Sequence, residues 1–153
     1  MHFHNLTLRR LAIAGFLLLA STAAQAVLTV HAPWVRPTPD RASTDAYMSL
    51  ISTEGAVLKE VRSTIATSVV IRAEGPVKRT FPQLALPAGV EVALSPDAVH
   101  LVLRGLAHPL GAGERVPLVL TIETANGARQ EISVNAEVRS HSPLDDERRA
   151  PRR

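Results

Sequence analysis

Residues 115–138 read RVPLVLTIETANGARQEISVNAEV, and this stretch decides the fold class. Apolar side chains alternate with other residues on both sides of Asn126-Gly127, at Val116, Leu118, Leu120, Ile122, Ile132, Val134, Ala136 and Val138. Alternation with a period of two is typical of a β-strand, and Asn-Gly between two such runs is a strong β-hairpin signal. The intervening positions of the second run are polar, so we expect a hairpin with one face on a core and the other in water.

The same texture extends over most of the chain. Short runs rich in Val, Leu, Ile and Thr recur between Pro, Gly, Asp and Asn residues. They predict strands over residues 27–35, 45–52, 56–63, 68–73, 77–81, 90–94, 99–104, 115–124 and 129–138. Prolines interrupt most windows that could form a helix, so no helix is predicted. Evenly spaced short strands indicate an all-β domain, either a sandwich or a Greek-key barrel.

The first 26 residues have the organisation of a secretory signal peptide. The pair Arg9-Arg10 supplies positive charge, residues 11–20 are apolar, and Ala24-Gln25-Ala26 is a typical cleavage site. A transmembrane helix needs about 20 apolar residues, and this run is shorter. We therefore expect a periplasmic protein, cleaved after Ala26, with no membrane span in the mature chain. An uncleaved anchor is the alternative, and the arginine pair leaves twin-arginine export open beside the favoured general secretory route.

Composition bounds the function of the mature chain. Residues 27–139 are expected to form one domain and residues 140–153 a disordered charged tail, because the apolar pattern stops at Ser140. Without the two signal arginines, 15 of the 17 basic residues remain against 14 acidic ones, an excess of one. No stripe of Lys and Arg appears, so no nucleic-acid binding is predicted. Cysteine is absent, which excludes disulfides, blue-copper sites, thiolate zinc sites and a cysteine nucleophile.

Several motifs in a fixed order resemble the periplasmic copper chaperones of the PCu(A)C type over roughly residues 28–138. They are His31-Ala-Pro-Trp34-Val-Arg36-Pro-Thr-Pro, Ala46-Tyr47-Met48, Leu86-Pro87-Ala88-Gly89, Leu94-x-Pro96, His100-Leu-Val-Leu-Arg-Gly105-Leu106 and Pro109-Leu110-x-x-Gly113-x-x-Val116-Pro117-Leu118-x-Leu120. The resemblance implies a cupredoxin-like Greek-key β-barrel. It also implies delivery of Cu(I) to the copper centre of a respiratory oxidase, and hence a periplasmic or membrane-anchored copper protein as partner.

The copper motif of that family has four ligands at fixed spacing. A histidine is followed, after ten intervening residues, by a methionine, and after twenty-one more residues by His-x-Met. Soft thioether sulfur suits the soft Cu(I) ion, and residues i and i+2 of a strand share one face. Here His100 matches the second histidine, but Val102 occupies the following methionine position and Lys78 the middle one. The first histidine falls on Thr67 or, with a shorter hairpin, on Arg72. One donor of four is kept, which predicts weak or absent Cu(I) binding.

Two further residues could contribute donors to a rebuilt metal site. Met48 is the only methionine of the mature chain, and it alternates with Ala46 and Leu50 as a core residue does. His31 precedes Ala-Pro-Trp, where a structural role is favoured. His100 is therefore the main metal candidate, with Met48 and His31 as minor ones. Cu(I) is the only cofactor that the resemblance implies.

A basic patch is predicted beside His100, made of Arg72, Lys78, Arg79 and Arg104. Such a patch could bind an acidic partner, and charges at an interface rim mainly affect the association rate. No enzyme is predicted, because the sequence has neither a Gly-x-Ser-x-Gly elbow nor a phosphate-binding glycine loop.

The sequence thus favours a copper-chaperone-like exported protein with a degenerate Cu(I) site. A working Cu(I) chaperone with an altered site around His100 is one alternative, and a metal-free partner-binding domain is the other.

Overall fold

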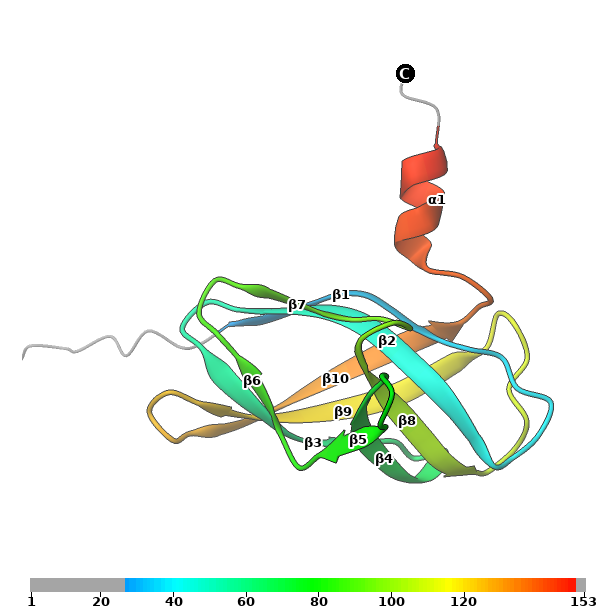
Figure 1. The fold of residues 1–153 in the computed structure, drawn as a ribbon, viewed down its shortest axis with the longest axis horizontal. Coiled ribbons are helices and arrows are strands. Elements are labelled where there is room, and N and C mark those ends of the chain that lie inside the picture. The colour runs from blue at the N-terminus through cyan, green and yellow to red at the C-terminus, as the bar shows by residue number, and fades with distance from the viewer. Residues whose placement is uncertain (1–26, 151–153) are drawn as a thin grey trace, which may run out of the picture.

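The computed structural model describes residues 27–150, so the predicted signal peptide lies outside the described residues. This part of the chain forms ten strands and one short helix (Figure 1). The strands are β1 (Leu28–Val35), β2 (Ser43–Ser52), β3 (Ala56–Arg62), β4 (Ala66–Ala73), β5 (Arg79–Phe81), β6 (Leu84–Leu86), β7 (Glu91–Leu94), β8 (Val99–Leu106), β9 (Arg115–Thr124) and β10 (Arg129–Val138), and the helix is α1 (Pro143–Arg149).

The strands join into one sheet in the order β5-β4-β8-β2-β1-β10-β9-β3-β6, with β7 paired to β2. Strands β1 and β10 run parallel, and the other strand pairs run antiparallel. The sheet curls into a nearly closed barrel (Figure 1). The predicted hairpin of residues 115–138 is β9 and β10, paired from Arg129 opposite Glu123 to Glu137 opposite Arg115. The all-β fold expected from the alternating pattern is confirmed, and of the two alternatives, sandwich or barrel, the sheet forms the barrel.

Strand β2 has two different neighbours along one of its edges. Its first part, from Ser43 to Ala46, pairs with β8, and its second part, from Met48 to Ile51, pairs with β7. The turn of residues 95–98 between β7 and β8 therefore lies beside the middle of β2. The side chains of the candidate functional site come together at this point.

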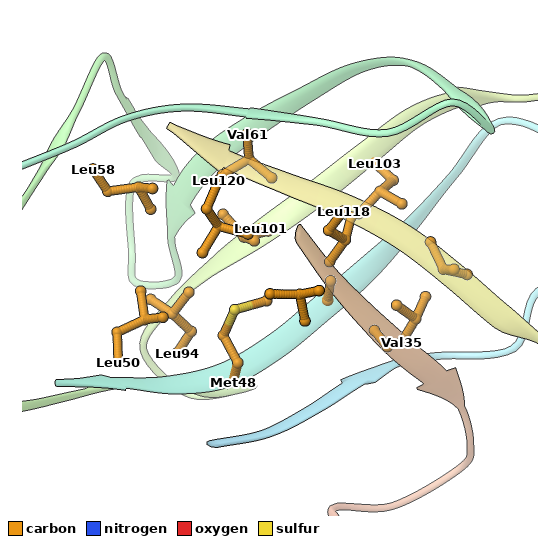
Figure 2. Packing of buried hydrophobic residues seen from close by; sticks show 14 of the residues in the cluster. Val35, Met48, Leu50, Leu58, Val61, Leu94, Leu101, Leu103, Leu118 and Leu120 are labelled. Carbon is orange, nitrogen blue, oxygen red and sulfur yellow. The ribbon is translucent and has the colours of Figure 1, made fainter. Parts of the chain in front are cut away.

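The core lies inside the curled sheet (Figure 2). Its fully buried leucines come from five strands and are Leu50, Leu58, Leu86, Leu101, Leu103, Leu118 and Leu120. Burying a side chain of this size contributes roughly 1.5–3 kcal/mol relative to leaving it exposed. Met48 is 3% exposed and lies in the same core, as its alternation with Ala46 and Leu50 indicates (Figure 2).

Helix α1 lies in the segment for which a disordered tail was expected, and it corrects that expectation for residues 143–149. The Ser142 side chain caps the helix by accepting a hydrogen bond from the Leu144 N–H, and a proline occupies the first turn. Acidic residues follow in the first turn and basic ones in the last, which suits the helix dipole. The helix buries none of its residues, so the hydrophobic pattern could not reveal it. In the described part of the chain, no helix has the length and apolar character needed to cross a membrane.

Candidate functional site

The outer face of β8 carries the predicted metal residue. Because side chains alternate along a strand, Leu101 and Leu103 point into the core while His100 and Val102 point outward. His100 is nevertheless only 1% exposed and Val102 only 2% exposed. Neighbouring strands cover them: in register, Arg72 of β4 lies opposite His100, and Asp45 of β2 lies opposite Val102.

The His100 ring has one nitrogen bonded and one without a partner. Its Nδ1 lies 3.1 Å from the carbonyl oxygen of Ala98. A carbonyl oxygen only accepts hydrogen bonds, so Nδ1 carries the hydrogen and, in the neutral ring, Nε2 presents a lone pair. Nε2 is buried and has no hydrogen-bond partner among the described residues. A buried polar atom without a partner costs about 1–3 kcal/mol.

Two carboxylates approach the unpartnered nitrogen. His100 Nε2 lies 3.5 Å from Glu74 Oε1 and 3.7 Å from Asp45 Oδ1. Glu74 directly follows β4, and Asp45 lies in β2, so the sheet register brings together residues that are far apart in sequence. The His100 ring and two carboxylates thus lie next to one another on the outer face of the barrel.

Arg72 balances this negative charge. Its Nη2 lies 3.7 Å from Glu74 Oε1 and 3.9 Å from Asp45 Oδ1, and its side chain is only 21% exposed. From the sequence, Arg72 was predicted to belong to a basic surface patch and to bring positive charge close to the site. In the structure its charge is instead compensated by two carboxylates, because the register places it across from His100.

Asp45, Arg72, Glu74 and His100 form a cluster, and aromatic side chains from the adjacent strands border it. The ring centroid of Tyr47 lies 4.6 Å from that of Trp34 and 5.8 Å from that of His100. The Arg36 guanidinium carbon lies 5.5 Å from the Tyr47 ring centre. The Tyr47 hydroxyl donates a long hydrogen bond, 3.5 Å, to Asp45 Oδ2. Burial raises the pKa of Tyr47 to about 12, and the negative charge of Asp45 adds to the shift, so the hydroxyl stays protonated.

An open cleft of about 420 Å³ gives solvent access to the cluster. It is lined by residues of β2 and β8, by residues that directly follow β1 and β4, and by the turn of residues 95–98, namely Arg36, Asp45, Tyr47, Glu74, Gly75, Pro96, Asp97 and His100. Three of these residues are acidic. The cleft is therefore polar.

The copper-motif positions can now be placed. Of the two alternatives for the first histidine, Arg72 is the one paired with His100, whereas the Thr67 hydroxyl donates to the Gly105 carbonyl further along β8. Lys78 is exposed in the connection between β4 and β5. The strand position two residues after His100 holds Val102, which has no donor atom.

The minor candidates do not join the cluster. Met48 lies in the core, and His31 is exposed on β1, before a register shift that separates it from Trp34. Neither residue lines the cleft. Within residues 27–150, no group of three or more His, Cys, Asp or Glu side chains is placed so that it could hold a metal ion.

The four residues of the predicted basic patch do not share one surface in the structure. Lys78, Arg79 and Arg104 are exposed, whereas Arg72 is turned toward the carboxylates. Sequence reasoning found His100 and Arg72 but missed Asp45 and Glu74. The available signal was Asp45 itself, a charged residue within the strand run STDAYMSLIS.

Comparison with solved structures identifies the class of this barrel. It is similar to the copper-bound PCuAC domain from PmoF2, with 19% identity over 77% of this chain and 100% of that one and a TM-score of 0.64. The apo PCuAC domain from PmoF1 gives 20% identity, 77% and 98% coverage and a TM-score of 0.63. The Cu(I) form of DR1885 from Deinococcus radiodurans is 28% identical over 77% of this chain and 83% of that one, with a TM-score of 0.55.

The protein is thus a cupredoxin-like β-barrel of the PCuAC type, as the motif resemblance predicted. The LpqE-like family model, which describes a lipoprotein family, matches residues 28–138. The chain belongs to the LpqE-like family. No curated protein matches it at the sequence level.

Proposed function

We propose that this protein is an exported, copper-chaperone-like domain whose site around His100 no longer holds Cu(I) tightly. The supporting observation is the donor set on the outer face of β8. One imidazole nitrogen is accompanied by the carboxylates of Asp45 and Glu74, and Val102 stands where the family motif has a thioether. Cu(I) prefers soft sulfur and imidazole ligands, whereas carboxylates suit harder cations.

The charge of Arg72 adds to this mismatch. A unit charge about 4 Å from a bound monovalent cation opposes it by roughly 4 kcal/mol at an effective dielectric constant of 20. The carboxylates of Asp45 and Glu74 offset part of this repulsion, so it is an upper bound. The absence of a second soft donor is therefore the stronger argument, since it holds whatever the charge balance.

The remaining function that we propose is partner binding. Arg79 of β5, Arg104 of β8 and Lys78, in the connection between β4 and β5, are exposed. They would attract an acidic periplasmic or membrane-anchored copper protein and mainly raise the association rate, which makes the interaction sensitive to salt. Export with cleavage after Ala26 places the domain in the same compartment. No catalytic role is proposed for this site.

A Cu(I) titration against a chromogenic chelator tests the proposal. The exported form of the protein is added anaerobically to the Cu(I)–chelator complex, and the loss of colour is followed. We expect that neither the wild-type protein nor the His100→Ala variant removes Cu(I) from the chelator at equimolar concentration. Stoichiometric removal of Cu(I) by the wild-type protein, lost in His100→Ala, would instead identify a working chaperone with an altered site.

A further inference from the structure

We propose that residues 140–150 are a detachable cover over an apolar recess beside the His100 cleft, and that the recess binds an apolar side chain of a partner protein when the cover leaves. This inference goes beyond the proposed function, because it depends neither on the affinity for Cu(I) nor on the exposed basic residues. It starts from two aromatic side chains, Trp34 and Tyr47, that are buried outside the barrel core.

Both aromatic side chains lie on the outer face of the sheet. Their strand neighbours Val35, Ala46 and Met48 belong to the core inside the barrel, so Trp34 and Tyr47 point outward. They are nevertheless only 5% and 2% exposed. Side chains on the outer face of a barrel become so buried only where another part of the chain covers them.

A recess of about 120 Å³ separates these rings from the C-terminal segment. On one side it is lined mainly by apolar residues of β1, β2, β7 and the turn after β7, among them Trp34, Tyr47, Met48, Leu94 and Pro96. On the other side it is lined by Ser142 and by Leu144 of α1. Tyr47 and Pro96 also line the acidic cleft, so the recess and the cleft share a wall.

The backbone is strained where β1 borders the recess. Ala32 lines the recess and has a φ of +47°, which residues other than glycine rarely adopt. It also precedes Pro33, and a residue before proline favours an extended backbone. Here the register between β1 and β2 shifts, between His31 and Trp34. Backbone strain of this kind is concentrated at binding and switch sites, which supports a functional role for the recess.

The cover is held weakly beyond Arg139, whose backbone N–H donates to the Val35 carbonyl and fixes the end of the barrel. Helix α1 has seven residues, buries none of them and projects away from the barrel (Figure 1), and helices this short are not stable alone. Asp146 holds the segment by accepting hydrogen bonds from Arg139 and, at 2.9 Å, from His141 Nε2. Asp146 and His141 are about half exposed, and exposed ion pairs stabilise little. The segment can therefore open, and Leu144 shows which kind of side chain suits the recess.

The test uses the whole protein and its only tryptophan, Trp34, as reporter. Leu144→Ser removes the apolar side chain of the cover, and Asp146→Ala removes both contacts that hold it. We expect acrylamide to quench the fluorescence of Trp34 roughly twofold more strongly in these variants than in the wild-type protein, because local opening becomes more frequent. Glu147→Ala, which removes an exposed acidic side chain from the same helix, is the matched control and should leave the quenching unchanged.

Binding to the recess is measured with N-acetyl-leucinamide, a neutral compound that carries one leucine side chain. The NMR signal of the Trp34 indole N–H should shift saturably as the compound is added. Leu144→Ser should bind it roughly fivefold more tightly than the wild-type protein, in which only the open fraction can bind.

Three results would overturn the inference: equal quenching in Leu144→Ser, Asp146→Ala and the wild-type protein, an equal rise in Glu147→Ala, or no saturable shift with N-acetyl-leucinamide in Leu144→Ser. Circular dichroism checks that each barrel is folded, and Leu144→Ala replaces Leu144→Ser if the latter is not. Because neither Cu(I) nor a basic surface residue enters these measurements, this proposal and the proposed function can each fail alone.

Discussion

Restoring soft donors at two positions should convert this protein into a Cu(I) binder. In the double variant Arg72→His/Val102→Met, the new imidazole lies across from His100 on the paired strand, and the new thioether lies two residues along β8 on the same face. Cβ atoms of directly opposed residues are about 4.5–5.5 Å apart, close enough for two imidazoles to share an ion. The site would then have three soft or imidazole donors instead of one.

The magnitude follows from the geometry. Removing a guanidinium about 4 Å from the ion relieves up to roughly 4 kcal/mol of repulsion, which corresponds to about a thousandfold in affinity. The added sulfur contributes beyond that. Against this gain, Val102 is only 2% exposed, so the larger methionine is expected to cost about 1–3 kcal/mol of folding stability through overpacking.

Competition with a chromogenic Cu(I) chelator measures the effect. The double variant should remove Cu(I) from the chelator at a one-to-one ratio, and the wild-type protein should not. The matched control is Arg79→His/Val102→Met, which adds the same two residue types but places the histidine on the exposed strand β5. If the folded double variant binds no better than this control, the assignment of the site to the outer face of β8 is refuted.

Three other predictions concern the barrel and its helix. The absorbance of Tyr47, the only tyrosine, should show ionisation near pH 12 in the folded protein, and stability should fall as pH rises from 10 towards 12, since the unfolded state ionises first. Gly105→Ala should lower the unfolding free energy in urea by about 1–3 kcal/mol more than Gly89→Ala. Both glycines have a positive φ, +62° and +68°, but only at Gly105 would the new Cβ clash with a neighbouring side chain, that of Thr67. Ser142→Ala should weaken helix α1 by about 1 kcal/mol, seen in NMR chemical shifts, while the barrel's unfolding midpoint stays unchanged because the helix buries no residue.

The strands were predictable because they depend on a local pattern. The alternation on either side of Asn126-Gly127 reports which face is buried, and β9 and β10 follow it residue by residue. Strand β6 lacked that signal, since three residues between Pro82 and Pro87 are too few to alternate. Helix α1 lacked it for another reason: its stability comes from a serine cap and charge placement, and not from an apolar face.

Of the residues in the site, only His100 could be singled out from the sequence without knowing the strand register. His100 stands out because it interrupts an apolar strand, but its neighbours come from β2 and from the end of β4. Which residues share a face across strands depends on register, and a shift by one residue would turn every side chain to the opposite face. The choice between Arg72 and Thr67 therefore depended on the length of a hairpin, and in the structure Arg72 is the residue that pairs with His100.

The energetics of the cluster argue for a role beyond holding the barrel together. Burying charged groups costs desolvation energy, and a buried ion pair is often replaced by apolar residues without loss of stability. Here Arg72, Glu74 and Asp45 are held at distances too long for strong hydrogen bonds, and His100 Nε2 gains no bond at all from the described residues. Apolar side chains at these positions would cover Val102 at lower cost. The cluster of partly buried charged side chains therefore makes the outer face of β8 the part of this fold to probe for function.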